Sequence, residues 1–358
     1  MSYSRTITLV VVLVMIAGAI GYIESHVARR GASNIPAVSV VPRISSTEKA
    51  KTLTLASELA GPTGFINTPD NAPITLGSYV GNKVVLLDFW TYSCINCQRT
   101  LPYLEAWYEK YKDYGLVIVG VHTPEFDFEK VYDNVAMAVK KYGLTYPVVL
   151  DSNYGTWNAY NNQYWPAEYL IDIDGYIAAH DVGEGDYAGR EAEIQKALQE
   201  RSDVLGLGLT IPGGTVDPTN AVKVIDAGSP ETYFGSARNE FLSNGTAGKA
   251  GVQSFTLPAT SDTNKLYLGG SWDIEPEYAT ANDGDTIMYT YNSKVIYFVA
   301  SSPQGSTLTL IQDGKTVGTV DVKTAQLYKL VENPTSGVHT LEIKVKGSGL
   351  EAFTFTFG

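Results

Sequence analysis

Cysteine is almost absent from this sequence, which has only two in 358 residues, Cys94 and Cys97. A structural zinc site needs four ligands, and there is neither a second C-x-x-C pair nor a pair of histidines at ligand spacing among the four present. Zinc is therefore a disfavoured alternative, and thiol chemistry is the leading interpretation of the pair.

Basic residues are also scarce: 26 lysines and arginines stand against 38 acidic residues, for a formal charge of −12. A surface of this sign repels the phosphates of a nucleic-acid backbone, which argues against a nucleic-acid partner. The length, on the other hand, exceeds that of one ordinary domain and predicts two domains with connecting segments.

The two cysteines stand where a buried strand is predicted to run into a helix, within the stretch Val84–Pro102. Unpaired backbone N–H groups and the positive end of the helix dipole stabilise the thiolate form of a cysteine at such a point, so Cys94 is expected to be the nucleophile. Cys97, one turn further on, is expected to be the buried resolving partner. A purely structural disulfide remains an alternative, although so short a loop would constrain the unfolded chain little.

An uncharged apolar stretch, Thr6–Ile23, follows a short tail of residues 1–5. It is just long enough to cross a bilayer and predicts one N-terminal transmembrane helix. A cleaved signal peptide is the rival interpretation, because Ala17–Ala19 has the small-x-small pattern of a processing site. Residues 24–53 resemble a flexible tether, and the long remainder of the chain is expected on the extracytoplasmic side, in the periplasm or at the cell surface.

Residues 54–201 alternate between strand and helix patterns, which predicts an α/β sheet of mixed direction. A turn-rich segment, residues 62–73, predicts a short hairpin at its start. The expected strands are Val84–Phe89, Leu116–Val121, Tyr146–Leu150, Ala167–Ile173 and Tyr176–Asp181, and the expected helices after the cysteines include Phe126–Tyr142, Tyr154–Asn161 and Tyr187–Arg201.

A glycine- and proline-rich linker, residues 202–221, separates this unit from residues 222–358, in which apolar and polar residues alternate repeatedly. Short alternating segments with turn signals between them predict an all-β antiparallel sandwich, a jelly roll. The expected strands are Lys265–Leu268, Thr286–Tyr291, Val295–Val299, Thr307–Ile311, Thr316–Val322, His339–Val345 and Ala352–Phe357.

Two motifs carry a specific resemblance: Asp88-Phe-Trp-Thr-Tyr-Ser-Cys-Ile-Asn-Cys97 and, downstream, Trp165-Pro-Ala-Glu-Tyr-Leu-Ile-Asp-Ile-Asp-Gly175. Together they resemble the thioredoxin fold, its TlpA-like branch, and within that branch the soluble portion of DipZ-type cytochrome c biogenesis proteins. Residues 270–278 and the closing residues 352–358 resemble the tail of the same proteins, which is similar in build to carbohydrate-binding modules.

The resemblance implies roles for several residues. Pro166 falls on the family's cis-proline, which faces the two cysteines and leaves the preceding backbone free to pair with an extended substrate. Asp88 matches a buried aspartate that could take a proton from Cys97, and Glu125 matches an acidic residue near the active site. Trp90 and Trp165, which belong to the two motifs, are candidate substrate contacts.

These observations predict a membrane-anchored extracytoplasmic thiol-disulfide oxidoreductase that reduces a protein disulfide, with no cofactor besides a redox-active Cys94–Cys97 disulfide. The multi-span domain of DipZ-type proteins is replaced here by a single predicted helix, so a separate electron donor, such as a membrane thiol transporter, is expected. A glycan is a candidate ligand of the sandwich through Trp272, Tyr267 and Tyr278, although core packing is the better explanation of these aromatics.

Two alternatives stay open. Thr91-x-x-Cys94 copies part of the signature of peroxiredoxins, the thiol peroxidases, although Leu87 stands where the proline of that signature belongs. The other alternative is non-enzymatic: the sandwich binds a glycan or a partner and the redox unit is vestigial.

Overall fold

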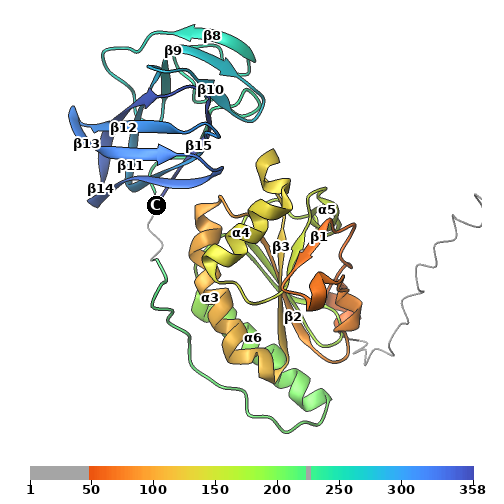
Figure 1. The fold of residues 1–358 in the computed structure, drawn as a ribbon. Coiled ribbons are helices and arrows are strands. Elements are labelled where there is room, and N and C mark those ends of the chain that lie inside the picture. Colours follow the sequence, from red (N-terminus) through yellow and green to blue (C-terminus); the bar gives the residue numbers. More distant parts are fainter. Residues whose placement is uncertain (1–47, 223–226) are drawn as a thin grey trace, which may run out of the picture. The chain divides into compact units, whose positions relative to one another are not determined.

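The computed structural model describes residues 48–222 and 227–358 (Figure 1). The apolar segment Thr6–Ile23 and most of the predicted tether fall outside them, so the membrane anchor stays a prediction. Among the residues described, no helix combines the length and the apolar character that crossing a bilayer requires.

A mixed six-stranded sheet with the strand order β1-β4-β3-β2-β5-β6 lies at the centre of residues 48–222 (Figure 1). Its strands are β1 (Gly64–Ile66), β2 (Val84–Trp90), β3 (Leu116–His122), β4 (Val148–Leu150), β5 (Ala167–Ile171) and β6 (Ile177–Val182). Strands β2, β3 and β4 are parallel, and the other neighbours pair antiparallel. Every residue of β2 is buried, as its unbroken apolar run predicts for a strand covered on both faces.

Helices cover this sheet on both faces. The helices are α2 (Lys49–Thr52), α3 (Ile95–Tyr111), α4 (Tyr132–Tyr142), α5 (Gly155–Ala159) and α6 (Tyr187–Val204), with short 3-10 turns η1 (Pro69–Asn71), η2 (Leu76–Ser78), η3 (Lys112–Tyr114) and η4 (Asp127–Lys130). Leu104 of α3, Val135 of α4 and Leu198 of α6 share one core cluster with the sheet. Trp157 of α5 packs against a second cluster, which contains residues of β2 and β3 together with Leu59 and Tyr160.

Two local predictions are wrong. The helix expected over Phe126–Tyr142 is divided into η4 and α4, because Val131 between them has extended backbone (φ −77°, ψ 118°). The predicted hairpin in residues 62–73 does not form, since β1 pairs with the distant strand β4. At β1 the long-range pairing with β4 determines the local structure.

Residues 227–358 form a nine-stranded antiparallel sheet. This confirms the prediction of an all-β antiparallel domain, whereas the jelly-roll topology stays a prediction. The strands are β7 (Thr232–Tyr233), β8 (Gly251–Phe255), β9 (Leu266–Ile274), β10 (Ala279–Ala281), β11 (Thr286–Ser301), β12 (Ser306–Gln312), β13 (Lys315–Val322), β14 (Gln326–Lys346) and β15 (Leu350–Phe357). One hydrogen-bonded order, β13-β12-β14-β11-β15-β10-β9-β8, joins them, with β7 paired to β15 and β9 also paired to β11.

The long strand β11 joins two segments that the sequence predicts as separate strands. Residues 292–294 lie between these two segments; there the register shifts between Ser293 and Val295, and the strand continues. A bulge of this kind bends a strand without ending it. The first half of β11 therefore pairs with β9, and the second half pairs with β15.

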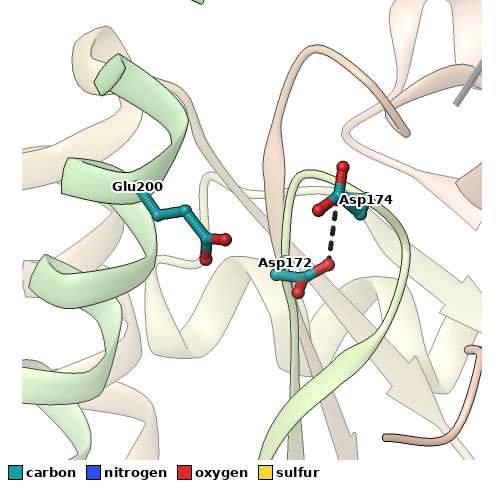
Figure 2. A group of neighbouring side chains, drawn as sticks. All are labelled: Asp172, Asp174 and Glu200. Atoms are coloured by element: carbon teal, nitrogen blue, oxygen red, sulfur yellow. Dashed lines mark hydrogen bonds between the residues drawn. The ribbon is translucent and has the colours of Figure 1, made fainter. Parts of the chain in front are cut away.

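A buried ion cluster ties α2 to the sheet. The carboxylates of Asp172, Asp174 and Glu200 point toward one another from the β5–β6 turn and from α6 (Figure 2). The ammonium group of Lys49 lies 2.7, 2.8 and 2.5 Å from them. Lys49, within the segment predicted as a tether (residues 24–53), is thus fixed to the folded unit.

Replacing Lys49 with methionine is expected to lower the free energy of unfolding by about 3 kcal/mol, since removing one partner leaves buried carboxylates uncompensated. Urea unfolding of the two proteins measures the difference. Lys51→Met is the matched control: its ion pair with Glu48 is largely exposed, so the change should stay within about 0.5 kcal/mol. Equal stability of Lys49→Met and the parent would show that the cluster contributes nothing.

Candidate active site

The junction of β2 and α3 places the two cysteines as predicted. Cys94 is the N-cap of α3, with extended backbone (φ −76°, ψ 119°), and its Sγ accepts a hydrogen bond from the backbone N–H of Cys97 at 3.3 Å. Both cysteines are free thiols; Cys94 is half-buried and Cys97 is only 1% exposed. The sulfur at the helix start is therefore the one that a substrate can reach.

The buried thiol of Cys97 holds its proton strongly. Burial is the largest cause that raises the pKa of Cys97 well above its ordinary value, and contact with the Cys94 side chain and the charge of Asp88 act in the same direction. A thiol must lose its proton before it can attack a disulfide. Resolution by Cys97 therefore requires a nearby group that can take that proton.

Asp88 lies on β2, fully buried at 1% exposure, and neither of its carboxylate oxygens has a hydrogen-bond partner. Burial raises the pKa of Asp88 well above its ordinary value, and the charge of Glu168 raises it further. A carboxyl group in this state can accept a proton at neutral pH more readily than a solvated one. Its position and burial fit the proton-accepting role that we predict for it.

The peptide bond between Trp165 and Pro166 is cis, as expected. The Trp165 carbonyl oxygen lies 4.0 Å from Cys94 Sγ. The indole Nε1 of Trp165 donates a hydrogen bond to the Thr123 carbonyl oxygen at 3.0 Å. Half-buried Trp165 thus lies beside the reactive sulfur, where a substrate contact is feasible. Trp90 is 0% exposed, and its predicted contact with the substrate stays a prediction.

Two glutamates, Glu125 and Glu129, follow β3, and the sequence analysis selected Glu125. The Glu125 carboxylate accepts hydrogen bonds from Arg238 Nη1 at 2.8 Å and from the Tyr233 hydroxyl at 2.9 Å, both in the C-terminal unit. The carboxylate that reaches the residue before Cys94 belongs to Glu129. The role predicted for Glu125 near the active site stays a prediction, and in the structure its carboxylate binds Arg238 and Tyr233.

Glu129 is fully buried and uses both oxygens. Its Oε1 accepts from the hydroxyl (2.6 Å) and the backbone N–H (3.3 Å) of Ser93, and its Oε2 accepts from the backbone N–H groups of Glu125 and Phe126. Burial raises the pKa of Glu129 to about 7 against the opposing effect of these hydrogen bonds. A single carboxyl group thus connects the cysteine loop with the loop after β3. The available sequence signal was an acid at the third position of a short turn, a capping-box position.

We expect Glu129→Gln to lower the free energy of unfolding by about 2 kcal/mol, because an amide NH₂ replaces an acceptor that faces N–H and O–H donors. The attack step should slow about 10-fold as the cysteine loop loses its support. Urea unfolding and disulfide reduction, both near pH 8 where Glu129 is ionised, provide the two values. Asp127→Asn, in the same short turn but with a largely exposed side chain, is the control and should leave the attack rate unchanged; a similar loss in both variants would contradict the special position of Glu129.

Aromatic residues of the C-terminal unit that the sequence offered as glycan contacts are mostly part of its core. Trp272 is 0% exposed and donates from Nε1 to the Gly269 carbonyl oxygen, and Tyr267 is 7% exposed. Tyr278 packs against Phe353, with ring centroids 5.1 Å apart. Core packing therefore accounts for Trp272 and Tyr267, and glycan binding stays an untested expectation.

Comparison with protein-family models divides the chain in the same way. Residues 48–180 match the AhpC/TSA family, and residues 229–358 match a family described as a thioredoxin-like C-terminal domain. The first match contains every residue proposed above for the thiol chemistry.

Several characterised relatives share one or both units. The chain is 40% identical to protein DipZ of Mycobacterium bovis over 304 residues, which is 85% of this chain and 43% of DipZ, so it spans less than half of that relative. It is 27% identical to the thiol-disulfide oxidoreductase YkuV of Bacillus subtilis, over 40% of this chain and 93% of YkuV. It is 32% identical to the thiol-disulfide oxidoreductase ResA of Bacillus thuringiensis, over 32% of this chain and 63% of ResA.

Proposed function

Because the chain belongs to the thioredoxin-fold thiol-disulfide oxidoreductases of the DipZ and TlpA kind, we propose that it reduces disulfide bonds of other proteins outside the cytoplasm. The observation that carries the proposal is the pair itself: a reachable Cys94 at a helix start with a buried, protonated Cys97 one turn away. Such a pair performs exchange in two steps, attack and resolution.

In the first step, the Cys94 thiolate attacks one sulfur of the substrate disulfide and the other sulfur leaves. In the second, Cys97 loses its proton and attacks Cys94 Sγ, which forms the Cys94–Cys97 disulfide and releases the second substrate thiol. The carbonyl group of Trp165, beside Cys94 Sγ, can accept a hydrogen bond from the backbone of a substrate in extended form. This favours a polypeptide as the substrate.

An oxidised pair has to be reduced again before the next turnover. The sequence has no further cysteine, and we propose that a separate dithiol protein supplies the two electrons. We place this donor in the membrane, as a thiol transporter, together with the anchor predicted at Thr6–Ile23. The anchor and the extracytoplasmic location are parts of the proposal that rest on the sequence.

The equilibrium potential of the Cys94/Cys97 pair, measured against glutathione buffers, tests the direction of electron flow. A reductant should have a potential near that of thioredoxin, about −270 mV, whereas an oxidant would lie near about −120 mV. A value at the oxidising end would overturn the proposed direction while leaving the exchange chemistry in place.

Peroxide reduction is the second candidate, favoured by the match to the AhpC/TSA family. The Thr91 hydroxyl, however, lies 3.4 Å from His122 Nε2, and Thr91 is fully buried. The Thr91 hydroxyl, which belongs to the peroxiredoxin-like signature, thus has His122 as its partner and is buried away from a peroxide. For this reason we rank peroxide reduction second. Peroxide consumption by the reduced protein, followed together with thiol loss, distinguishes the two activities.

A further inference from the structure

Three acidic residues stand side by side across neighbouring strands of the first sheet. Asp88 of β2 is the register partner of Glu168 of β5, and Glu168 is in turn the partner of Asp181 of β6. Side chains of directly paired residues project from the same face of a sheet, with Cβ atoms about 5 Å apart. The three carboxyl groups therefore form a row on one face, from the strand that precedes the cysteines toward the edge of the sheet.

Exposure rises along this row. Asp88 is 1% exposed and Glu168 is 2% exposed, whereas the Asp181 side chain is 38% exposed. Two carboxyl groups thus lie in the interior, and the third is in contact with solvent. Cys97, whose proton must be removed, is at the buried end, where the charge of Asp88 acts on it.

The two buried carboxyl groups of the row have oxygen atoms without a hydrogen-bond partner. Glu168 Oε1 accepts from Arg190 Nη1 at 2.7 Å, but its Oε2 and both oxygens of Asp88 have no partner in the residues described. The Tyr146 hydroxyl, also buried and unpartnered, is close enough for the charges of Asp88, Glu168 and Cys97 to act on it. Buried polar atoms are normally satisfied, so a group of unsatisfied ones calls for an explanation such as proton transfer.

Arg190 of α6 holds the outer part of the row in place. Besides Glu168, it contacts the Gly183 carbonyl oxygen through Nη2 at 2.8 Å, and its Nε lies 3.8 Å from Asp181 Oδ1. The charged and titratable groups facing Glu168 are therefore Asp88, Asp181, Arg190 and Tyr146. Burial and the charge of Asp181 raise the pKa of Glu168 to about 7, while Arg190 opposes them. Glu168 can thus gain and lose a proton near neutral pH.

We propose that Glu168 relays the proton that Cys97 gives up during resolution, receiving it from Asp88 and passing it to solvent beside Asp181. The inference rests on the proposed exchange function and deepens it. The Cys97 S–H bond breaks, the proton moves to Asp88 and then to Glu168, and the Cys97 sulfur forms a bond with Cys94 Sγ as the Cys94–substrate bond breaks. The electron pair of the broken bond leaves on the substrate sulfur, so the protein pair is oxidised and the substrate is reduced.

Under this proposal Glu168 is a positioning residue, since it acts through Asp88 and does not touch the reacting sulfurs. A purely structural buried ion pair of Glu168 with Arg190 is the competing explanation. The two differ in which step they affect: a relay acts on resolution alone, whereas a structural defect would disturb attack and stability together.

The reaction of the reduced protein with an aromatic disulfide that releases a coloured thiolate separates the two steps. The first equivalent of thiolate appears when Cys94 attacks, and the second appears when Cys97 resolves. In Glu168→Gln we expect an unchanged first phase and a second phase slowed about 10-fold, less than the roughly 10²- to 10⁴-fold loss when a general base is removed outright, because Asp88 is still present. The midpoint of its pH profile should move to lower pH, because the charge of Glu168 that raises the pKa of Asp88 is removed. Glu168→Asp, which keeps a carboxyl group, should recover part of the rate.

Glu184→Gln is the matched control, because it removes one carboxylate from another buried arginine pair, Arg99–Glu184, which lies outside the row. Both phases should keep their parental rates in this variant. A second phase in Glu168→Gln with the parental rate and pH profile overturns the relay, as does an equal slowing in Glu184→Gln. If Glu168→Gln fails to fold, Glu168→Asp decides: a parental pH profile would overturn the relay, and a shifted one supports it. A parental protein that releases no thiolate at all would instead overturn the exchange function itself.

Discussion

Replacing Cys94 with serine should abolish disulfide reduction, with a loss of at least about 1,000-fold in turnover. A serine hydroxyl is a far weaker nucleophile toward a disulfide than a cysteine sulfur. The fold should survive, because Cys94 is half-buried, and a hydroxyl can also accept from the Cys97 backbone N–H and donate toward the Trp165 carbonyl oxygen. Reduction of a disulfide-bonded protein, measured as released thiols, gives the result.

Cys97→Ser is the companion variant, and it should fail at the other step. Attack by Cys94 continues, but without a resolving thiol the substrate stays bound, so mixed disulfides should accumulate to about one per protein. Non-reducing electrophoresis of the reaction mixture reveals them. Parental turnover in both variants would disprove the thiol mechanism, while trapping in Cys94→Ser instead would reverse the two roles.

Much of the first unit could be predicted from the sequence because its signals are local. The apolar run of β2, the helix that follows and the proline after Trp165 each act over a few residues, and the structure has all three. Cys94 and Cys97 could be assigned different roles for the same reason, since position within one helical turn determines which sulfur is reachable.

Glu129 and Glu168 could not be selected because their roles depend on partners far along the chain. Glu129 lies 36 residues from Ser93, and its inward orientation accompanies the division of a predicted helix. In the sequence, Glu168 cannot be distinguished from any other acidic residue in a strand. Only the strand register shows that it lies between Asp88 and Asp181. Strand pairing and side-chain direction are set by tertiary packing, which a single sequence does not display.

The buried carboxyl of Asp88 leads to the second large effect: Asp88→Asn should slow resolution about 100-fold while making the protein more stable. The rate falls because an amide cannot accept the proton of Cys97. Stability rises because Asp88, 1% exposed and without a hydrogen-bond partner, is unfavourable when ionised, at a cost of about 2 kcal/mol. The two-phase thiolate assay and urea unfolding near pH 8 measure the two changes.

The stabilisation expected in Asp88→Asn should depend on pH. Since burial raises the pKa of Asp88 in the folded state, the folded protein binds this proton more tightly than the unfolded chain does. Stability therefore falls as the pH rises from the ordinary carboxyl range, about pH 4, through the raised value, and Asp88→Asn should remove that part of the fall. The stabilisation should thus be large near pH 8 and small near pH 4. Equal stability of the two proteins near pH 8, with resolution unimpaired, would mean that Asp88 finds partners in solution and does not act as the proton acceptor. A gain in stability together with the loss in rate would instead mean that the fold keeps an unfavourable buried carboxyl group because the second step of the reaction requires it.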